Sequence, residues 1–166
     1  MKNMFPALAL IPIVALAASG SSDASFYRSL AEGGMAEVRL GKLAQQKAED
    51  PNVKDFAAMM VKDHSAANAQ LRALAATKDV TLPKGPGIKA RAKKTELEAL
   101  SGHAFDSSYI ASQIKAHEDT VALLQKEISS GTDDDAKAFA QKVLPTVQNH
   151  LQAADKLADG LGVSHH

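Results

Sequence analysis

The sequence predicts an all-α protein, an antiparallel four-helix bundle with an additional short helix before the third bundle helix. Alanine is abundant and aromatic residues make up only 4% of the 166 residues, a composition that favours packed helices over sandwiched strands. Apolar residues recur at intervals of three and four, which is the spacing of one helix face. Glycines and prolines break this pattern at few positions, so the predicted helices are long.

The helices are justified in order by their start and stop signals. Asp50 followed by Pro51 is typical of a cap and a first helical residue, so this pair separates the first helix from the second. Prolines and glycines over residues 81–87 predict a loop. The acidic run that contains Asp133 and Asp134 suits the positive end of a helix dipole, and either residue is a candidate cap for the last helix. The helices are expected at about residues 25–49, 51–78, 88–100, 105–130 and 134–161.

The N-terminus has the pattern of an export signal. Lys2 precedes an apolar stretch over residues 5–18, and small residues then offer cleavage sites after Ala17 and after Ala24. The alternative, a membrane anchor, is less favoured because the apolar stretch is shorter than the about 20 residues of a membrane span. We therefore expect a periplasmic or secreted protein with no stable membrane span once the signal is removed. The predicted organisation is a signal over residues 1–24, a bundle over 25–162 and a polar tail over 163–166.

Composition excludes several classes of function. Lysine plus arginine and aspartate plus glutamate number 19 each, and no basic stripe occurs, so nucleic acid is not an expected partner. The absence of cysteine excludes disulfides, thiolate metal sites and thiol catalysis. The chain also has no glycine-rich phosphate loop and no recognisable Ser/His/Asp arrangement.

Three histidines, His64, His117 and His150, each take the place of an apolar residue in a helical stripe, near the middle of a different predicted helix. The mid-points of antiparallel helices of similar length lie at the same level of a bundle, so the three imidazoles are expected to converge. Neutral imidazoles suit a divalent transition metal or copper better than calcium or magnesium. The stripe around His117 consists of Ile110, Ile114, Val121 and Leu124.

Other side chains are candidates for the same metal site. Glu37 lies near the middle of the first helix in line with small residues, although a second apolar face competes with this placement. Met60 lies one turn before His64, and a thioether beside an imidazole favours copper, whereas the alternative for Met60 is core packing. Glu118, like Asp63, is a neighbour of a histidine and is able to bond a histidine on another helix. The remaining histidines, which are not expected in the core, are His103, His165 and His166.

Several motifs resemble those of the domain-of-unknown-function 4142 family of exported bacterial proteins. The resemblance covers nearly all of the predicted mature chain, and it implies a ferritin-like antiparallel four-helix bundle without implying a settled activity. The matching motifs are residues 26–44 (FYRSLAEGGMAEVRLGKLA), residues 56–64 (FAAMMVKDH), Tyr109-Ile110, His117-Glu118, Leu144-Pro145 and His150-Leu151.

The sequence departs from ferritin-like oxidases in its carboxylates. Those enzymes place a Glu-x-x-His pair on each of two helices, and this chain has no such pair. A di-iron centre is therefore not expected, and an enzyme is the third hypothesis. The leading hypothesis is an exported protein that binds a transition metal through the histidines, in metal handling or stress protection. The alternative is a structural or envelope-stress module with a polar His/Glu core and no metal.

Overall fold

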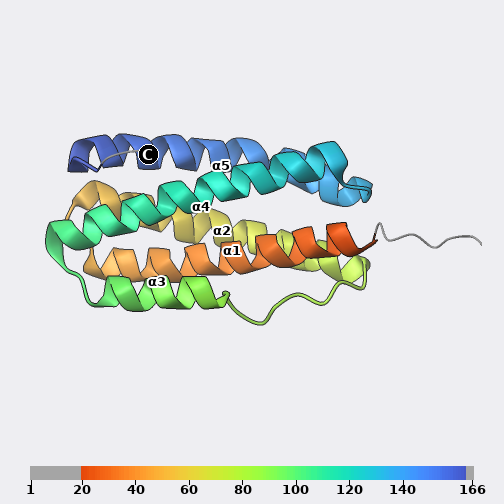
Figure 1. Cartoon of the computed structure of the whole chain (residues 1–166), viewed down its shortest axis with the longest axis horizontal. Coiled ribbons are helices and arrows are strands. Elements are labelled where there is room, and N and C mark those ends of the chain that lie inside the picture. Colours follow the sequence, from red (N-terminus) through yellow and green to blue (C-terminus); the bar gives the residue numbers. More distant parts are fainter. Residues whose placement is uncertain (1–19, 164–166) are drawn as a thin grey trace, which may run out of the picture.

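The structure is a computed structural model that describes residues 20–163, and this part of the chain is helical with no strand (Figure 1). The all-α prediction is confirmed, including the additional short helix. Most of the predicted export signal and the end of the predicted tail lie outside the described residues. The helices are α1 (Gly20–Lys47), α2 (Pro51–Thr77), α3 (Ile88–Glu98), α4 (Gly102–Ser130) and α5 (Asp134–Leu161).

The four long helices form two antiparallel hairpins, α1 with α2 and α4 with α5 (Figure 1). The hairpins pack together so that α1 lies against α4 and α2 against α5. Each hairpin has a short turn, whereas the connection from α2 to α4 over residues 78–101 returns along the bundle and contains α3, which lies beside α1 (Figure 1). Within residues 20–163, no helix is both long and apolar enough to span a membrane.

Side-chain caps fix the helix ends close to their predicted positions. The Asp50 side chain accepts a hydrogen bond of 2.7 Å from the Asn52 N–H at the start of α2. Asp133, rather than Asp134, caps α5, and its carboxylate accepts from the backbone N–H groups of residues 135 and 136. The main difference is that α1 begins at Gly20 instead of residue 25, because Asp23 is buried and anchors this first turn by accepting from Thr132.

The apolar core is divided into two clusters, one in each half of the bundle. Every long helix passes from one cluster to the other, and a polar side chain lies between them on each helix: Glu37, His64, His117 and His150. Apolar residues in the helical stripes of α2, α4 and α5 supply much of this core, and the buried ones include Val53, Phe56, Leu71, Leu124 and Val147. Those that are only partly buried include Ile114, Val121, Val143 and Leu157. The centre of the bundle is therefore a polar layer between two apolar ones.

A buried carboxylate joins the two hairpins at one end of the bundle. Asp106 on α4 is only 2% exposed, and it accepts hydrogen bonds from the backbone N–H groups of Glu49 and Asp50 at 3.2 and 2.9 Å. These N–H groups belong to the turn between α1 and α2, where neither helix supplies them with a partner. Asp106 thus supplies the hydrogen-bond acceptor for two backbone N–H groups in the turn of the other hairpin.

We expect Asp106→Ala to lower the free energy of unfolding by about 1–3 kcal/mol, because the N–H groups of the α1–α2 turn lose their acceptor in a partly buried position. Urea denaturation followed by circular dichroism measures this loss. The matched control is Asp119→Ala on the same helix, where the aspartate side chain is 67% exposed and the change is expected to stay within about 0.5 kcal/mol. Equal losses in the two variants would contradict the anchoring role of Asp106.

Candidate metal centre

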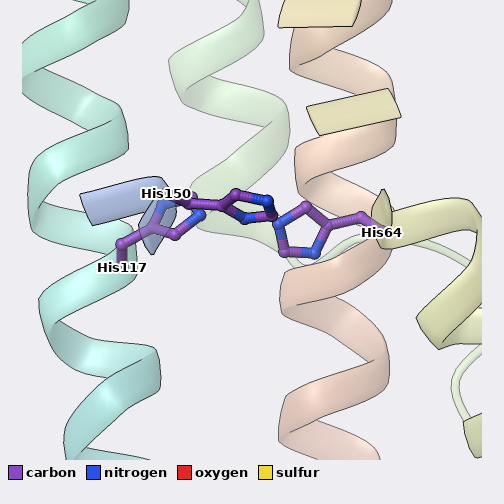
Figure 2. A group of neighbouring side chains, drawn as sticks. All are labelled: His64, His117 and His150. Carbon is purple, nitrogen blue, oxygen red and sulfur yellow. The ribbon is translucent and has the colours of Figure 1, made fainter. Parts of the chain in front are cut away.

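The three mid-helix histidines meet at the centre of the bundle. His64 comes from α2, His117 from α4 and His150 from α5, and their rings turn toward one another (Figure 2). One ring nitrogen from each lies within 4.8 Å of the others, and the ring centroids are 5.4–5.5 Å apart. They meet because each histidine lies near the middle of a helix of 27 to 29 residues.

Hydrogen bonds hold one ring nitrogen of His117 and one of His150 and leave the other nitrogen of each ring unengaged. The Nδ1–H of His117 donates to the Gln113 carbonyl oxygen at 2.8 Å, so Nε2 carries the lone pair. The Nε2–H of His150 donates to Asp63 Oδ2 at 3.0 Å, which leaves the lone pair on Nδ1. Among the described residues, neither of these lone-pair nitrogens nor His64 Nε2 has a hydrogen-bond partner. This pattern, in which the far nitrogen is held by a carbonyl or a carboxylate, is how proteins orient metal-binding histidines.

The surroundings keep the three imidazoles neutral. Burial, together with the neighbouring His117 and His150, lowers the pKa of His64 from 6.5 to about 3. Burial also lowers the pKa of His117 to about 4, against the effect of its backbone hydrogen bond. The pKa of His150 is lowered by burial as well, although Asp63 opposes this. At neutral pH all three side chains are therefore in the form that binds metal ions.

The geometry suits one transition-metal ion with an open coordination position. A metal–nitrogen bond of about 2.0–2.1 Å places two nitrogens on the same ion no more than about 4.2 Å apart. The spacing of at most 4.8 Å between the histidine nitrogens is close to this limit, and small ring rotations would close the difference. Three histidines leave the fourth position of a tetrahedral ion for a ligand from outside the protein.

The other predicted site residues lie in different surroundings. Glu37 is buried on α1 and lines the same cavity as His64 and His150, but it is not part of the histidine cluster. Met60 is fully buried in the apolar cluster on the side of α3, and Glu118 is exposed. His103 is exposed at the start of α4, whereas His165 and His166 lie outside the described residues.

Two buried residues near the site were missed by the sequence analysis. Gln113 and Tyr109 on α4 are both fully buried, one and two turns before His117. In the described part of the chain, neither the Gln113 amide atoms nor the Tyr109 hydroxyl has a hydrogen-bond partner. A spacing of four residues from His117 was the signal that could have placed Gln113 on the same face. The polar layer is thus larger than the three histidines.

Burial also changes the ionisation of Glu37. It raises the pKa of this carboxyl from 4.5 to about 7, and the nearby Gln113 amide opposes the change only in part. The unfolded chain releases the proton near pH 4.5, whereas the folded protein holds it to about pH 7. The stability contributed by the protonated form is therefore complete below pH 4.5 and is lost as the pH rises through 7.

Glu37→Gln replaces this carboxyl with an amide that cannot ionise. In metal-free protein, the free energy of unfolding of the variant relative to wild type should rise between pH 5 and pH 8, by on the order of 2 kcal/mol. Urea denaturation with chelator present, at several pH values, measures the free energy of unfolding of both proteins. The histidines titrate in both, so their contribution drops out of the difference. A difference that stays constant over this range would show that the folded protein does not raise the pKa of Glu37.

Comparisons with known proteins show the fold and the family. The structure is similar to a DUF305 protein from Streptomyces coelicolor, with a TM-score of 0.75 and 15% identity over 90% of this chain and 100% of that one. It is also similar to CopM in its Cu(I)-bound form, with a TM-score of 0.70 and 14% identity over 83% of this chain and 96% of that one.

A DUF305 fragment from Deinococcus radiodurans has a TM-score of 0.70 and 14% identity over 85% of this chain and 95% of that one. By sequence, the chain matches none of the curated proteins. The family described as domain of unknown function (DUF4142) matches residues 13–157. The match covers α1, α2, α4 and most of α5, so the chain belongs to the DUF4142 family.

Proposed function

We propose that this protein binds a transition-metal ion through His64, His117 and His150, as an exported metal-handling or metal-stress protein. The observation that carries the proposal is the convergence of three histidines from three helices: one ring nitrogen of each lies within 4.8 Å of the others, and each ring has a buried nitrogen without a hydrogen-bond partner among the described residues. Core histidines with a purely structural role would be expected to use both ring nitrogens or to lie apart. Here the three rings lie together, and each keeps one buried nitrogen without a partner among residues 20–163.

The comparisons favour copper, whereas the donor set is compatible with several transition metals. Neutral imidazoles bind zinc, copper, nickel and ferrous iron, and a site of nitrogen donors alone does not select among them. CopM, which shares the fold, was crystallised with Cu(I), with Cu(II) and with silver. This supports copper as the first ion to test. Met60 is packed among apolar side chains, so we assign it to the core rather than to the ion.

The lack of carboxylates in the histidine cluster distinguishes this proposal from the iron chemistry of ferritin-like oxidases. The long connection between α2 and α4 supports a ferritin-like topology, which has one such crossover. A di-iron centre needs several carboxylates, whereas the three side chains that converge here are all histidines. We therefore propose binding rather than oxidase activity.

The buried Asp23 supports one of the two predicted cleavage sites. Cleavage after Ala24 would remove Asp23 and its bond to Thr132, together with the first turn of α1. Cleavage after Ala17 would leave this end of the bundle intact. Export with removal of residues 1–17 is therefore the form of the mature protein that we propose.

Elemental analysis of untagged protein, purified from its native compartment, tests the proposal. We expect about one copper or zinc ion per chain, and the same stoichiometry when chelator-treated protein is titrated with Zn(II), Cu(II) or Cu(I). Because burial lowers the pKa of His64 to about 3 and that of His117 to about 4, protons should begin to displace the ion only below about pH 5. A protein that carries no metal and takes up none would contradict the proposal.

A further inference from the structure

A cavity of about 290 Å³ lies beside the metal centre, between the two hairpins. All four long helices contribute to its wall. His64, His150 and Glu37 are in this wall, whereas His117 is not. The cavity therefore reaches the metal centre from one side, and the open coordination position is expected to face it.

The wall is mostly apolar between two polar ends. At the outer end the Lys142 ammonium on α5 donates to the Gln70 Oε1 on α2 at 2.7 Å, and both side chains are exposed. At the inner end lie the histidines and Glu37, whose Oε2 is buried without a hydrogen-bond partner in the described structure. The larger apolar side chains of the wall are Leu30, Leu71, Leu123, Phe139, Val143 and Val147, and the wall also contains polar Ser29, Asn68, Thr120 and Thr146.

The volume indicates what size of molecule would fill the cavity, which is partly open to solvent. An apolar cavity of about 150 Å³ in another protein binds benzene. A cavity of about 290 Å³ is roughly twice as large, and it therefore suits a molecule of about two rings. Apolar walls with a few fixed polar groups are also typical of small-molecule sites.

We propose that this cavity binds a small aromatic nitrogen heterocycle of about two rings, with its heterocyclic end toward Glu37 and the three histidines. The apolar ring lies against Phe139 and Val143, where burial from water stabilises it. A ring N–H reaches Glu37 Oε2, which is buried without a hydrogen-bond partner within residues 20–163. The second ring nitrogen takes the open position on the ion, and this last step alone rests on the proposed metal site.

The probe for the test is 4-phenylimidazole, and imidazole is the matched probe without the apolar ring. Chelator-treated full-length protein is titrated with each, and backbone amide chemical shifts are followed by NMR. We expect 4-phenylimidazole to shift the amides that line the cavity and to bind at least about tenfold more tightly than imidazole. Equal binding of the two probes, or shifts scattered outside the cavity, would overturn the proposal.

The same titrations of Co(II)-loaded protein test whether the heterocyclic nitrogen of the probe binds the metal ion. The visible absorption of Co(II) should change when 4-phenylimidazole binds. The probe concentration needed for half-saturation should be lower for the Co(II)-loaded protein than for the metal-free protein. Co(II) uptake without any preference for 4-phenylimidazole would overturn this proposal and leave the metal site intact. Binding of the probe by metal-free protein that takes up no Co(II) would instead contradict the proposed function.

Val143 is partly buried and lines the cavity, so the larger side chain of Val143→Phe fills the cavity and the variant is expected to fold. This variant should bind 4-phenylimidazole at least about tenfold more weakly while Co(II) uptake is unchanged. Val38→Phe, a partly buried position on α1 outside the cavity wall, is the matched control and should bind like wild type. Leu123→Phe provides a second filled cavity if Val143→Phe does not fold. Undiminished binding in a folded, filled variant would overturn the proposal.

Discussion

His117→Ala is expected to abolish stoichiometric metal binding, with a loss of affinity of more than about 100-fold. The removal of a group that only orients a metal ligand costs about 10–100-fold, so the loss of a ligand itself should cost more. His117 lies at 1% exposure with its Nδ1 held by a backbone carbonyl, and it belongs to the one histidine cluster of the described residues. Competition with a chromophoric chelator measures the affinities, and His64→Ala should behave in the same way.

Two control variants separate this site from weaker binding elsewhere. His103→Ala removes an exposed histidine at the start of α4 and should leave the affinity unchanged. Met60→Leu should also leave the binding of Zn(II) and Cu(I) unchanged, because Met60 is packed in the apolar core. If Met60→Leu selectively weakened Cu(I), the thioether would belong to the site. Equal losses in the His117, His64 and His103 variants would show that binding is nonspecific.

Added metal is expected to raise the melting temperature of wild-type protein by roughly 10 °C. An ion bound only by the folded state, at about 1,000 times its dissociation constant, stabilises that state by about 4.1 kcal/mol. A domain of this size gains about 2–4 °C for each kcal/mol. Thermal melting monitored by circular dichroism, with chelator and then with Zn(II) or Cu(II), measures the shift.

His150→Leu should lose this metal-dependent rise while remaining folded without metal. Asp63 loses its partner in the variant, but its side chain is 31% exposed and is able to reach water. Leucine also fills the interior position without an unpaired polar atom, so the metal-free variant should be as stable as metal-free wild type. If the melting temperature of wild type responded to no metal, the alternative hypothesis, a structural module with a polar core, would account better for the histidines.

Much of the fold is predictable because its signals are local. The interval of three and four between apolar residues and the Asp50-Pro51 pair predict long helices whose ends lie within a few residues of those observed. The convergence of the histidines follows from the same information, since each is near the middle of a helix of similar length. The sequence did not decide which of two faces of α1, the one with Glu37 or the second apolar face, lies in the core. Both are buried, because α1 contacts α2, α3 and α4.

The sequence by itself determined the helices, the level of each histidine and the family, because periodicity, caps and motifs are properties of the chain alone. Only the tertiary structure decided that Asp63 holds His150, that Asp106 anchors the opposite turn and that a cavity adjoins Glu37. These depend on the rotation and separation of helices from different hairpins. A small rotation changes which side chains meet without changing any helical stripe, so sequence periodicity cannot specify those contacts.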